Sequence, residues 1–192
     1  MAGTGNSRTE QRNAALGKSV SLPLSPKTNT KKMKRQKVIP GSIFKLQFDE
    51  NSCTFGRVLR FGDVAVYDCR TNDSNFADNQ IIIGSKIIFK GLMNDGAIKY
   101  GKWPIIGFEP LEKSLLDSKY FLPDVGKSES FKLIQNGGFS FDHPRSAIIN
   151  VPFGGINDVI HVEQIIKDHY ANTENVFQKM NYTDLGLSLP KY

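Results

Sequence analysis

The residues that could perform chemistry are few, and they do not form a catalytic pattern. Gly126-Lys127-Ser128 could end a phosphate-binding loop, but that loop needs a glycine five residues before its Gly-Lys pair, where Phe121 stands. His161 and His169 lie roughly 80° apart around a helix, so they are not the i, i+4 pair of a zinc-binding helix. No serine stands in a Gly-x-Ser-x-Gly elbow. The sequence therefore predicts a non-enzymatic protein without metal or cofactor.

The cysteines and the hydropathy pattern predict reduced thiols, no membrane-spanning helix and no secretory signal. Cys53 and Cys69 are too few for a disulfide framework and are expected to be reduced thiols. No apolar run reaches the roughly 18 residues that a membrane-spanning helix requires. The N-terminus also lacks the apolar core of a secretory signal.

Charge divides the 192-residue chain into two parts. Residues 1–38 hold nine Lys or Arg and one acid, a formal charge of +8, and almost no large apolar side chains. Such a segment cannot bury enough surface to offset its ordering entropy, so we predict a disordered basic tail. Residues 39–192 carry −2 and are predicted to form a single β-rich domain. The tail could bind nucleic acid electrostatically, or it could be a solvated extension.

A bent sheet is expected to begin the domain. Apolar residues alternate from Ser42 to Phe48, as in a half-buried strand. Two further strands flank Gly62-Asp63, which suits a two-residue type II′ turn. This register would place Arg57 opposite Asp68, an ion pair at the end of the hairpin.

Two apolar stretches suggest buried strands. The only tryptophan leads the stretch from Trp103 to Phe108, which we interpret as a central strand with Trp103 as a core anchor. The β-branched runs 81–83 and 87–89 are interpreted as one buried strand bent at Gly84.

The C-terminal third supplies a hairpin and a helix. A three-residue loop, Asn136 to Gly138, would keep four apolar side chains of the 131–141 hairpin on one face. Apolar residues recur at helical spacing from 158 to 180, with Asn157 as N-cap and a possible interruption at 171–173. We therefore expect an α+β fold: a strongly bent antiparallel sheet or small barrel, extended by this hairpin and covered by the helix.

The order of several short motifs resembles the immunity protein 26 family of bacterial polymorphic toxin systems. The resemblance covers roughly residues 39–125, and its strongest pieces contain Gly-Arg-Val and Gly-x-Trp-x-Ile-Ile-Gly. The motifs, in order, are Pro40-Gly41-Ser42-Ile43-Phe44, Phe55-Gly56-Arg57-Val58-Leu59, Val66-Tyr67-Asp68, Ile87-Ile88-Phe89, and Gly101-Lys102-Trp103-Pro104-Ile105-Ile106-Gly107 followed by Pro110-Leu111.

The resemblance implies a protein that binds and blocks a cognate toxin, acting in the cytoplasm when the toxin acts there. Acidic groups on a β scaffold would complement a basic toxin surface. The alternative is a small β-barrel that binds nucleic acid with its basic tail as an arm. Deleting the tail should abolish nucleic-acid binding but leave toxin neutralisation intact.

Candidate binding residues come from one polar loop and from the segment after the Trp103 strand. The predicted toxin-binding residues are Asp73, Phe76, Asp78, Glu109 and Glu112. An aromatic residue between acids suits an interface anchor; the competing interpretation is that Phe76 folds inward and the acids only maintain solubility. The residues expected to be structural are Gly56, Arg57, Asp68 and Trp103.

Overall fold

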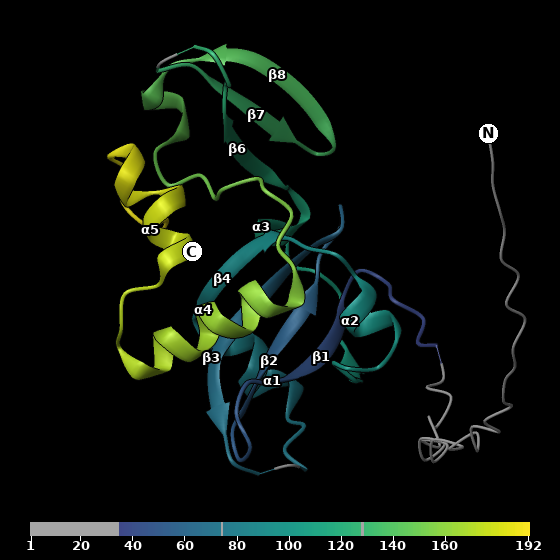
Figure 1. The fold of residues 1–192 in the computed structure, drawn as a ribbon. Helices are drawn as coiled ribbons and strands as arrows, with labels where there is room; N and C mark the ends of the chain where they lie inside the picture. Colours follow the sequence, from purple (N-terminus) through teal and green to yellow (C-terminus); the bar gives the residue numbers. More distant parts are fainter. Residues whose placement is uncertain (1–34, 74, 128) are drawn as a thin grey trace, which may run out of the picture. The chain divides into compact units, whose positions relative to one another are not determined.

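Two separate antiparallel sheets organise the protein (Figure 1). The structure is a computed structural model, and it describes residues 35–73, 75–127 and 129–192. The larger sheet has five strands in the order β4-β3-β2-β1-β5. Their bounds are β1 Ser42–Gln47, β2 Cys53–Val58, β3 Asp63–Thr71, β4 Ile87–Leu92 and β5 Ile105–Phe108. The predicted α+β class is confirmed, and the sheet is open rather than closed into a barrel.

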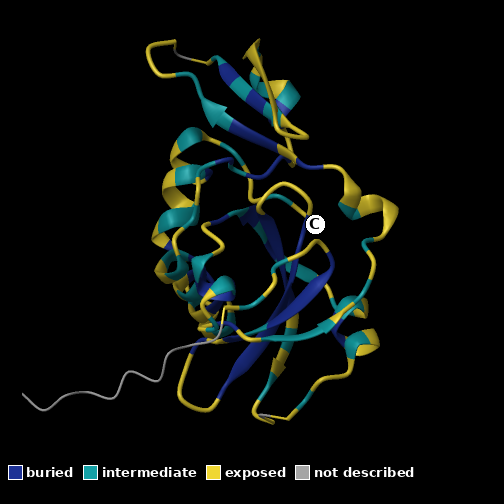
Figure 2. Ribbon diagram, turned by 90° about the vertical axis from the view of Figure 1, so that its right-hand side faces the viewer, coloured by how far each residue is buried: buried dark blue, intermediate teal, exposed yellow. Residues whose placement is uncertain are grey.

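One face of this sheet packs against a helix. The predicted alternation of β1 is confirmed, because Phe44, Leu46 and Phe48 are all buried in the main core. Figure 1 draws α4, Val159–Ala171, across this face, and Figure 2 shows the central strands as buried. Val162, Ile165 and Ile166 of α4 are buried in the same cluster.

The remaining helices are short. Asn172 ends α4 in the left-handed conformation, at the interruption that the sequence indicated. Asp158, rather than the predicted Asn157, is the N-cap of α4. The other helices are α1 Asn79–Gly84, α2 Gly96–Lys99, α3 Lys113–Leu116 and α5 Val176–Asn181, with 3₁₀ turns at Arg145–Ile148 and Thr183–Leu185.

The second sheet contains the C-terminal hairpin. Its strands are β6 Lys119–Pro123, β7 Phe131–Gln135 and β8 Gly138–His143, in that order. The prediction that this hairpin extends the first sheet is therefore wrong. Strand β6, which the sequence analysis did not predict, takes the place beside β7.

The loop of this hairpin also differs from the prediction. Gln135 pairs with Gly138, so the loop is the two residues Asn136 and Gly137, both with positive φ (51° and 83°), as a type I′ turn requires. The shorter loop separates the apolar side chains: Phe131 and Leu133 are buried, whereas residues 139 and 141 are exposed.

The run Ile81-Ile82-Ile83 is helical, so its interpretation as a strand is wrong. The carboxylate of Asp78 accepts hydrogen bonds from the backbone N–H groups of Gln80 and Ile81, which caps α1 at its N-terminus. A cap of this kind satisfies donors that a helix leaves free in its first turn. The local capping chemistry outweighs the β propensity of three isoleucines.

Trp103 is a core anchor as predicted, but the strand after it is not central. Strand β5 begins at Ile105 and forms an edge of the sheet. Pro104 explains this position, because proline has no N–H to donate to a sheet ladder and is confined to strand ends and edges. The Trp103 ring is 1 % exposed and stacks on Phe44, with ring centroids 5.4 Å apart.

The predicted pairing of Arg57 with Asp68 is wrong. Val58 pairs with Val64 and Arg57 with Ala65, so the connection is longer than the two-residue turn at Gly62-Asp63. The Asp63 carboxylate accepts a hydrogen bond from the Phe61 N–H and stabilises this wider loop. An odd shift in register turns side chains to the opposite face, which places Arg57 away from Asp68.

The predicted disordered tail lies, up to residue 34, outside the described residues. Gln36 already belongs to the folded part, although the sequence analysis placed it in the tail. Its side chain donates to the carbonyls of Ile98 and Trp103 and accepts from the Ile105 N–H. Gln36 therefore helps to fix the turn that carries Trp103.

Gly56 leaves room for the Phe44 ring, and we expect Gly56→Ala to destabilise the protein by about 1–3 kcal/mol. A Cβ at this position would lie 2.2 Å from Phe44 Cζ and 2.8 Å from the Ala65 carbonyl oxygen. The ring would have to move and lose its stacking on Trp103. Urea unfolding followed by tryptophan fluorescence measures the effect.

Gly84→Ala is the matched control, because a Cβ on Gly84 would meet no atom within 4 Å. Alanine also favours a helix over glycine, so this variant should be neutral or slightly stabilised. Equal stability of the two variants would contradict the packing described at Gly56.

Candidate binding surface

A buried arginine, Arg57, lies beneath the segment that carries two of the predicted acids, Glu109 and Glu112. Arg57 of β2 has no exposed side-chain area. Its Nη1 donates to both carboxylate oxygens of Glu112, at 2.9 and 2.8 Å. Its Nη2 donates to the Glu109 carbonyl at 3.0 Å and to the Pro110 carbonyl. Arg57 therefore holds the 109–112 segment against the sheet.

The electrostatics of Arg57 make it a permanent positive charge. Burial alone would lower the pKa of Arg57, but hydrogen bonds with Tyr67 and Glu112 outweigh burial and raise it. Burial also raises the pKa of Tyr67, whose hydroxyl lies 3.5 Å from Arg57 Nη1. Neither group can exchange a proton near neutral pH, so this pair has a structural role rather than an acid–base role.

Glu109 and Asp78 are brought together by the start of helix α1. The Glu109 carboxylate accepts from the side-chain amides of Asn79 and Gln80, each at 3.4 Å. The backbone N–H of Gln80 donates to the Asp78 carboxylate at 3.0 Å. Gly107 allows this contact, because a Cβ there would lie 2.5 Å from Asn79 Oδ1.

The three carboxylates of Asp78, Glu109 and Glu112 are here called the acidic rim. Each has a fixed hydrogen-bond donor: a helix N-terminus, a pair of amides and a buried guanidinium. The Glu112 side chain is still 45 % exposed, so a partner could reach its carboxylate. The sequence analysis missed Asn79 and Gln80. The available signal was their position directly after Asp78, a residue type that commonly caps a helix.

Phe76 and Asp73 do not form the predicted aromatic anchor between acids. Phe76 is half-buried, and its ring lies 5.5 Å from that of Phe55 in a core cluster beneath α1. Asp73 is exposed, and its carboxylate accepts from the Asn75 N–H within its own loop. Phe76 thus follows the competing interpretation, in which it folds inward.

Asp68 lies elsewhere, near the end of helix α4. Its carboxylate is 3.7 Å from Nε2 of His169, a contact that is an ion pair only when the imidazole is protonated. Both side chains are about 40 % exposed, so the contribution to stability is small.

A second buried polar group, Asp63, joins the two sheets and was also missed. Its carboxylate accepts from the hydroxyls of Ser118 and Tyr120, at 2.9 and 2.7 Å. Burial, together with the neighbouring carboxylate, raises the pKa of Tyr120 far above its ordinary value. The sequence analysis placed Asp63 in a turn and so gave no reason to expect its burial.

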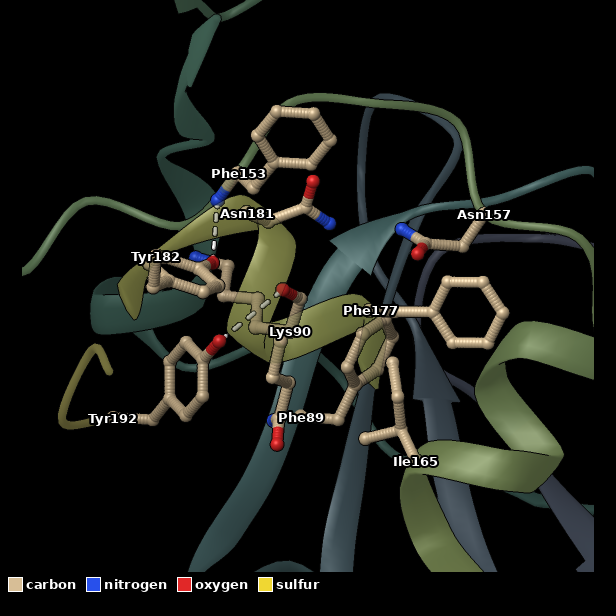
Figure 3. A pocket seen from close by; sticks show the side chains of 10 residues that line it. Phe89, Lys90, Phe153, Asn157, Ile165, Phe177, Asn181, Tyr182 and Tyr192 are labelled. Carbon is tan, nitrogen blue, oxygen red and sulfur yellow. Dashed lines mark hydrogen bonds between the residues drawn. The ribbon is translucent and has the colours of Figure 1, made fainter. Parts of the chain in front are cut away.

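One small cavity lies among strand β4, the segment before α4, and helices α4 and α5 (Figure 3). Tyr182 lines it, and its hydroxyl oxygen accepts a hydrogen bond from the Phe153 N–H at 2.6 Å. The cavity measures about 20 Å³, which is room for a single water. It is therefore a packing defect rather than a substrate site. No group of three or more potential metal ligands occurs within the described ranges.

The fold and the site define an α+β protein in which a buried arginine, Arg57, holds one of the three carboxylates of the acidic rim. Residues 39–126 match the family model Immunity protein 26, so this segment, just under half of the chain, is similar to that family. The match confirms the resemblance and ends before strand β7. Searches of curated proteins and of solved structures returned no match. Over the described residues, no helix is long and apolar enough to cross a membrane.

Proposed function

We propose that this protein is a non-enzymatic immunity protein that binds and neutralises a cognate bacterial toxin. The observation that carries the proposal is the match of residues 39–126 to the immunity protein 26 family. Such a protein works as a stoichiometric partner, in the cytoplasm when its toxin acts there. It requires a stable surface rather than a catalytic constellation.

The acidic rim and Asp73 are the proposed toxin-facing residues. The buried contacts of Arg57 support this choice, because they hold the Glu112 carboxylate in place before binding. A side chain that is already ordered loses less conformational entropy when a partner arrives. Fixed carboxylates would steer a basic toxin surface and complement it. Phe76 contributes by supporting the loop from beneath.

The variant Asp73→Lys/Asp78→Asn tests this surface. Asparagine caps a helix about as well as aspartate, so the second change removes the charge of Asp78 while helix α1 keeps its N-cap. We expect at least a tenfold weaker complex with the cognate toxin domain. The loss should lie mainly in the association rate, and the salt dependence of binding should become shallower.

Asp184→Lys is the control, since this exposed acid lies in the C-terminal 3₁₀ turn outside the family match. It should bind the toxin as the unaltered chain does. If the double variant keeps both its affinity and its salt dependence, the interface lies elsewhere on the protein.

Removal of residues 1–34 separates toxin binding from the nucleic-acid alternative. This truncation leaves Gln36 and its contacts with the Trp103 turn intact. Toxin affinity should be unchanged. A truncation that abolished the function of the protein would instead favour a nucleic-acid-binding module with a basic arm.

A further inference from the structure

A larger cavity lies beside the outer strand β4 of the five-stranded sheet. Its volume is about 330 Å³, within the range of roughly 300–1,000 Å³ that is typical of small-molecule sites. Its walls come from β4, from the α3 region, from the start of β6 and from two later segments of the chain. The residues used below are Ile87, Lys90, Leu115, Lys119, Val151 and Lys191.

The charged side chains of this groove are predominantly basic. Lys90, Lys119 and Lys191 line it, together with one carboxylate, that of Asp117. The Asp117 carboxylate already accepts a hydrogen bond from the Asn136 side-chain amide at 3.3 Å. Residues 39–192 carry a net charge of −2, so a groove with three ammonium groups runs against the charge of its surroundings.

Lys90 is the best-placed of the three for binding an anion. Its Nζ donates to the Asp117 backbone carbonyl at 3.3 Å, and no carboxylate in the described part of the chain forms an ion pair with it. Burial lowers its pKa, and the more distant charges of Asp63 and Asp117 oppose that shift. Ala65 of β3 pairs with Arg57 of β2 on one side and with Lys90 of β4 on the other. Arg57 has a carboxylate partner, Glu112, whereas Lys90 has no such ion pair among the described residues.

The rest of the groove is apolar. Ile87 of β4, Leu115 of α3 and Val151 of the segment before α4 contribute aliphatic walls, and Tyr192 adds an aromatic ring. The tyrosine is held there by a long hydrogen bond, 3.5 Å, from its hydroxyl to the Lys90 carbonyl. A ligand that satisfied both kinds of surface would carry an anionic group on a small apolar body.

We propose that this groove binds a small organic anion, with its carboxylate or phosphate group toward Lys90 and its apolar body against Ile87, Leu115 and Val151. The ligand would contact both sheets, through Lys90 and Lys119. Its binding should therefore stabilise the folded chain as well as occupy the groove. This inference does not depend on the proposed recognition of a toxin.

Titration of the full chain with four six-carbon probes tests the proposal: hexanoate, hexyl phosphate, hexylamine and 1-hexanol. Calorimetry and amide chemical shifts report the binding. We expect the two anions to bind with shifts at groove residues, the amine not to bind, and the alcohol to bind at least tenfold more weakly. Binding of hexyl phosphate alone would identify a phosphate site, and binding of both anions a general anion site.

Lys90→Met removes the charge while keeping an apolar stem, and it should weaken anion binding at least tenfold. Lys191→Met offers an exposed second variant, if the first proves unstable, and should weaken binding several-fold. Lys167→Met, an exposed position on α4, is the matched control and should change nothing. Because all variants keep residues 1–38, binding by the basic tail is the same in each. Equal binding of hexylamine, no binding of either anion, or full binding by both groove variants would overturn the proposal.

Discussion

Replacing Arg57 with alanine should destabilise the protein by about 2–5 kcal/mol, as expected when a large, fully buried side chain is truncated. The change deletes the donors to Glu112 and to two backbone carbonyls, those of Glu109 and Pro110. It also leaves an empty space in a fully buried position. Urea unfolding followed by Trp103 fluorescence should give a clearly lower midpoint.

Two further variants make this result specific. Arg57→Lys keeps the charge, but a single ammonium group cannot donate to Glu112 and to both backbone carbonyls at once. Its stability should therefore fall between those of wild type and Arg57→Ala. Arg60→Ala removes an exposed arginine from the neighbouring loop and should stay within about 0.5 kcal/mol of wild type. A loss below about 1 kcal/mol for Arg57→Ala would show that this ion pair does not hold the 109–112 segment.

Trp103→Ala should cost a similar amount, about 3–5 kcal/mol, because a large buried side chain leaves a cavity that the core cannot fill. The indole ring stacks on Phe44 at an interplanar angle of 8°. Its Nε1 donates to the Glu163 carboxylate at 3.1 Å, which connects the turn before β5 to helix α4. Far-UV circular dichroism is the appropriate probe, since the variant has no tryptophan.

The conservative variant Trp103→Phe separates packing from hydrogen bonding. It keeps an aromatic ring against Phe44 but removes the indole donor, so it should lose less than half of the alanine effect. Glu163 retains the ammonium group of Lys102 at 2.7 Å, which limits the cost of losing that donor. If Trp103→Phe were as unstable as Trp103→Ala, the hydrogen bond to α4 would matter more than the packing.

Local periodicity predicted those parts of the fold in which one face is buried. The alternation in β1 and the helical stripe of α4 both follow from the main core that these two elements share. The α+β class follows in turn, because a sheet and a helix with one apolar face each must cover one another. Trp103 was also predicted correctly as an anchor, since a lone tryptophan in an apolar stretch is most often buried.

The failures occurred where a single polar contact decides the local geometry. Asp78 caps a helix over three isoleucines that favour a strand, and Asp63 stabilises a loop wider than a two-residue turn. Each contact involves a carboxylate and backbone N–H groups only two or three residues away, so propensity averaged over a window does not detect it. Pro104 carried a signal against a central strand that the sequence analysis did not use, because its missing N–H is incompatible with a central strand.

The candidate site was only partly predictable. Glu109 and Glu112 were selected as a pair by their place after the Trp103 stretch, but their common link to Arg57 depends on contacts across more than 50 positions of the chain. Nothing in the local sequence around Arg57 indicates that long-range partner. Phe76 was selected as a toxin-binding residue because it stands in a polar loop. Its ring instead packs inward on Phe55 of strand β2.

The most direct test of the central claim is a growth measurement in bacteria that express the cognate toxin domain. Cells that also express the full chain should grow as cells without toxin do, and the purified partners should form a stable stoichiometric complex. Cells that express Arg57→Ala should be protected less, in proportion to the folded protein that remains. If the full chain forms no complex and gives no protection against that toxin, the assignment of an immunity function is contradicted.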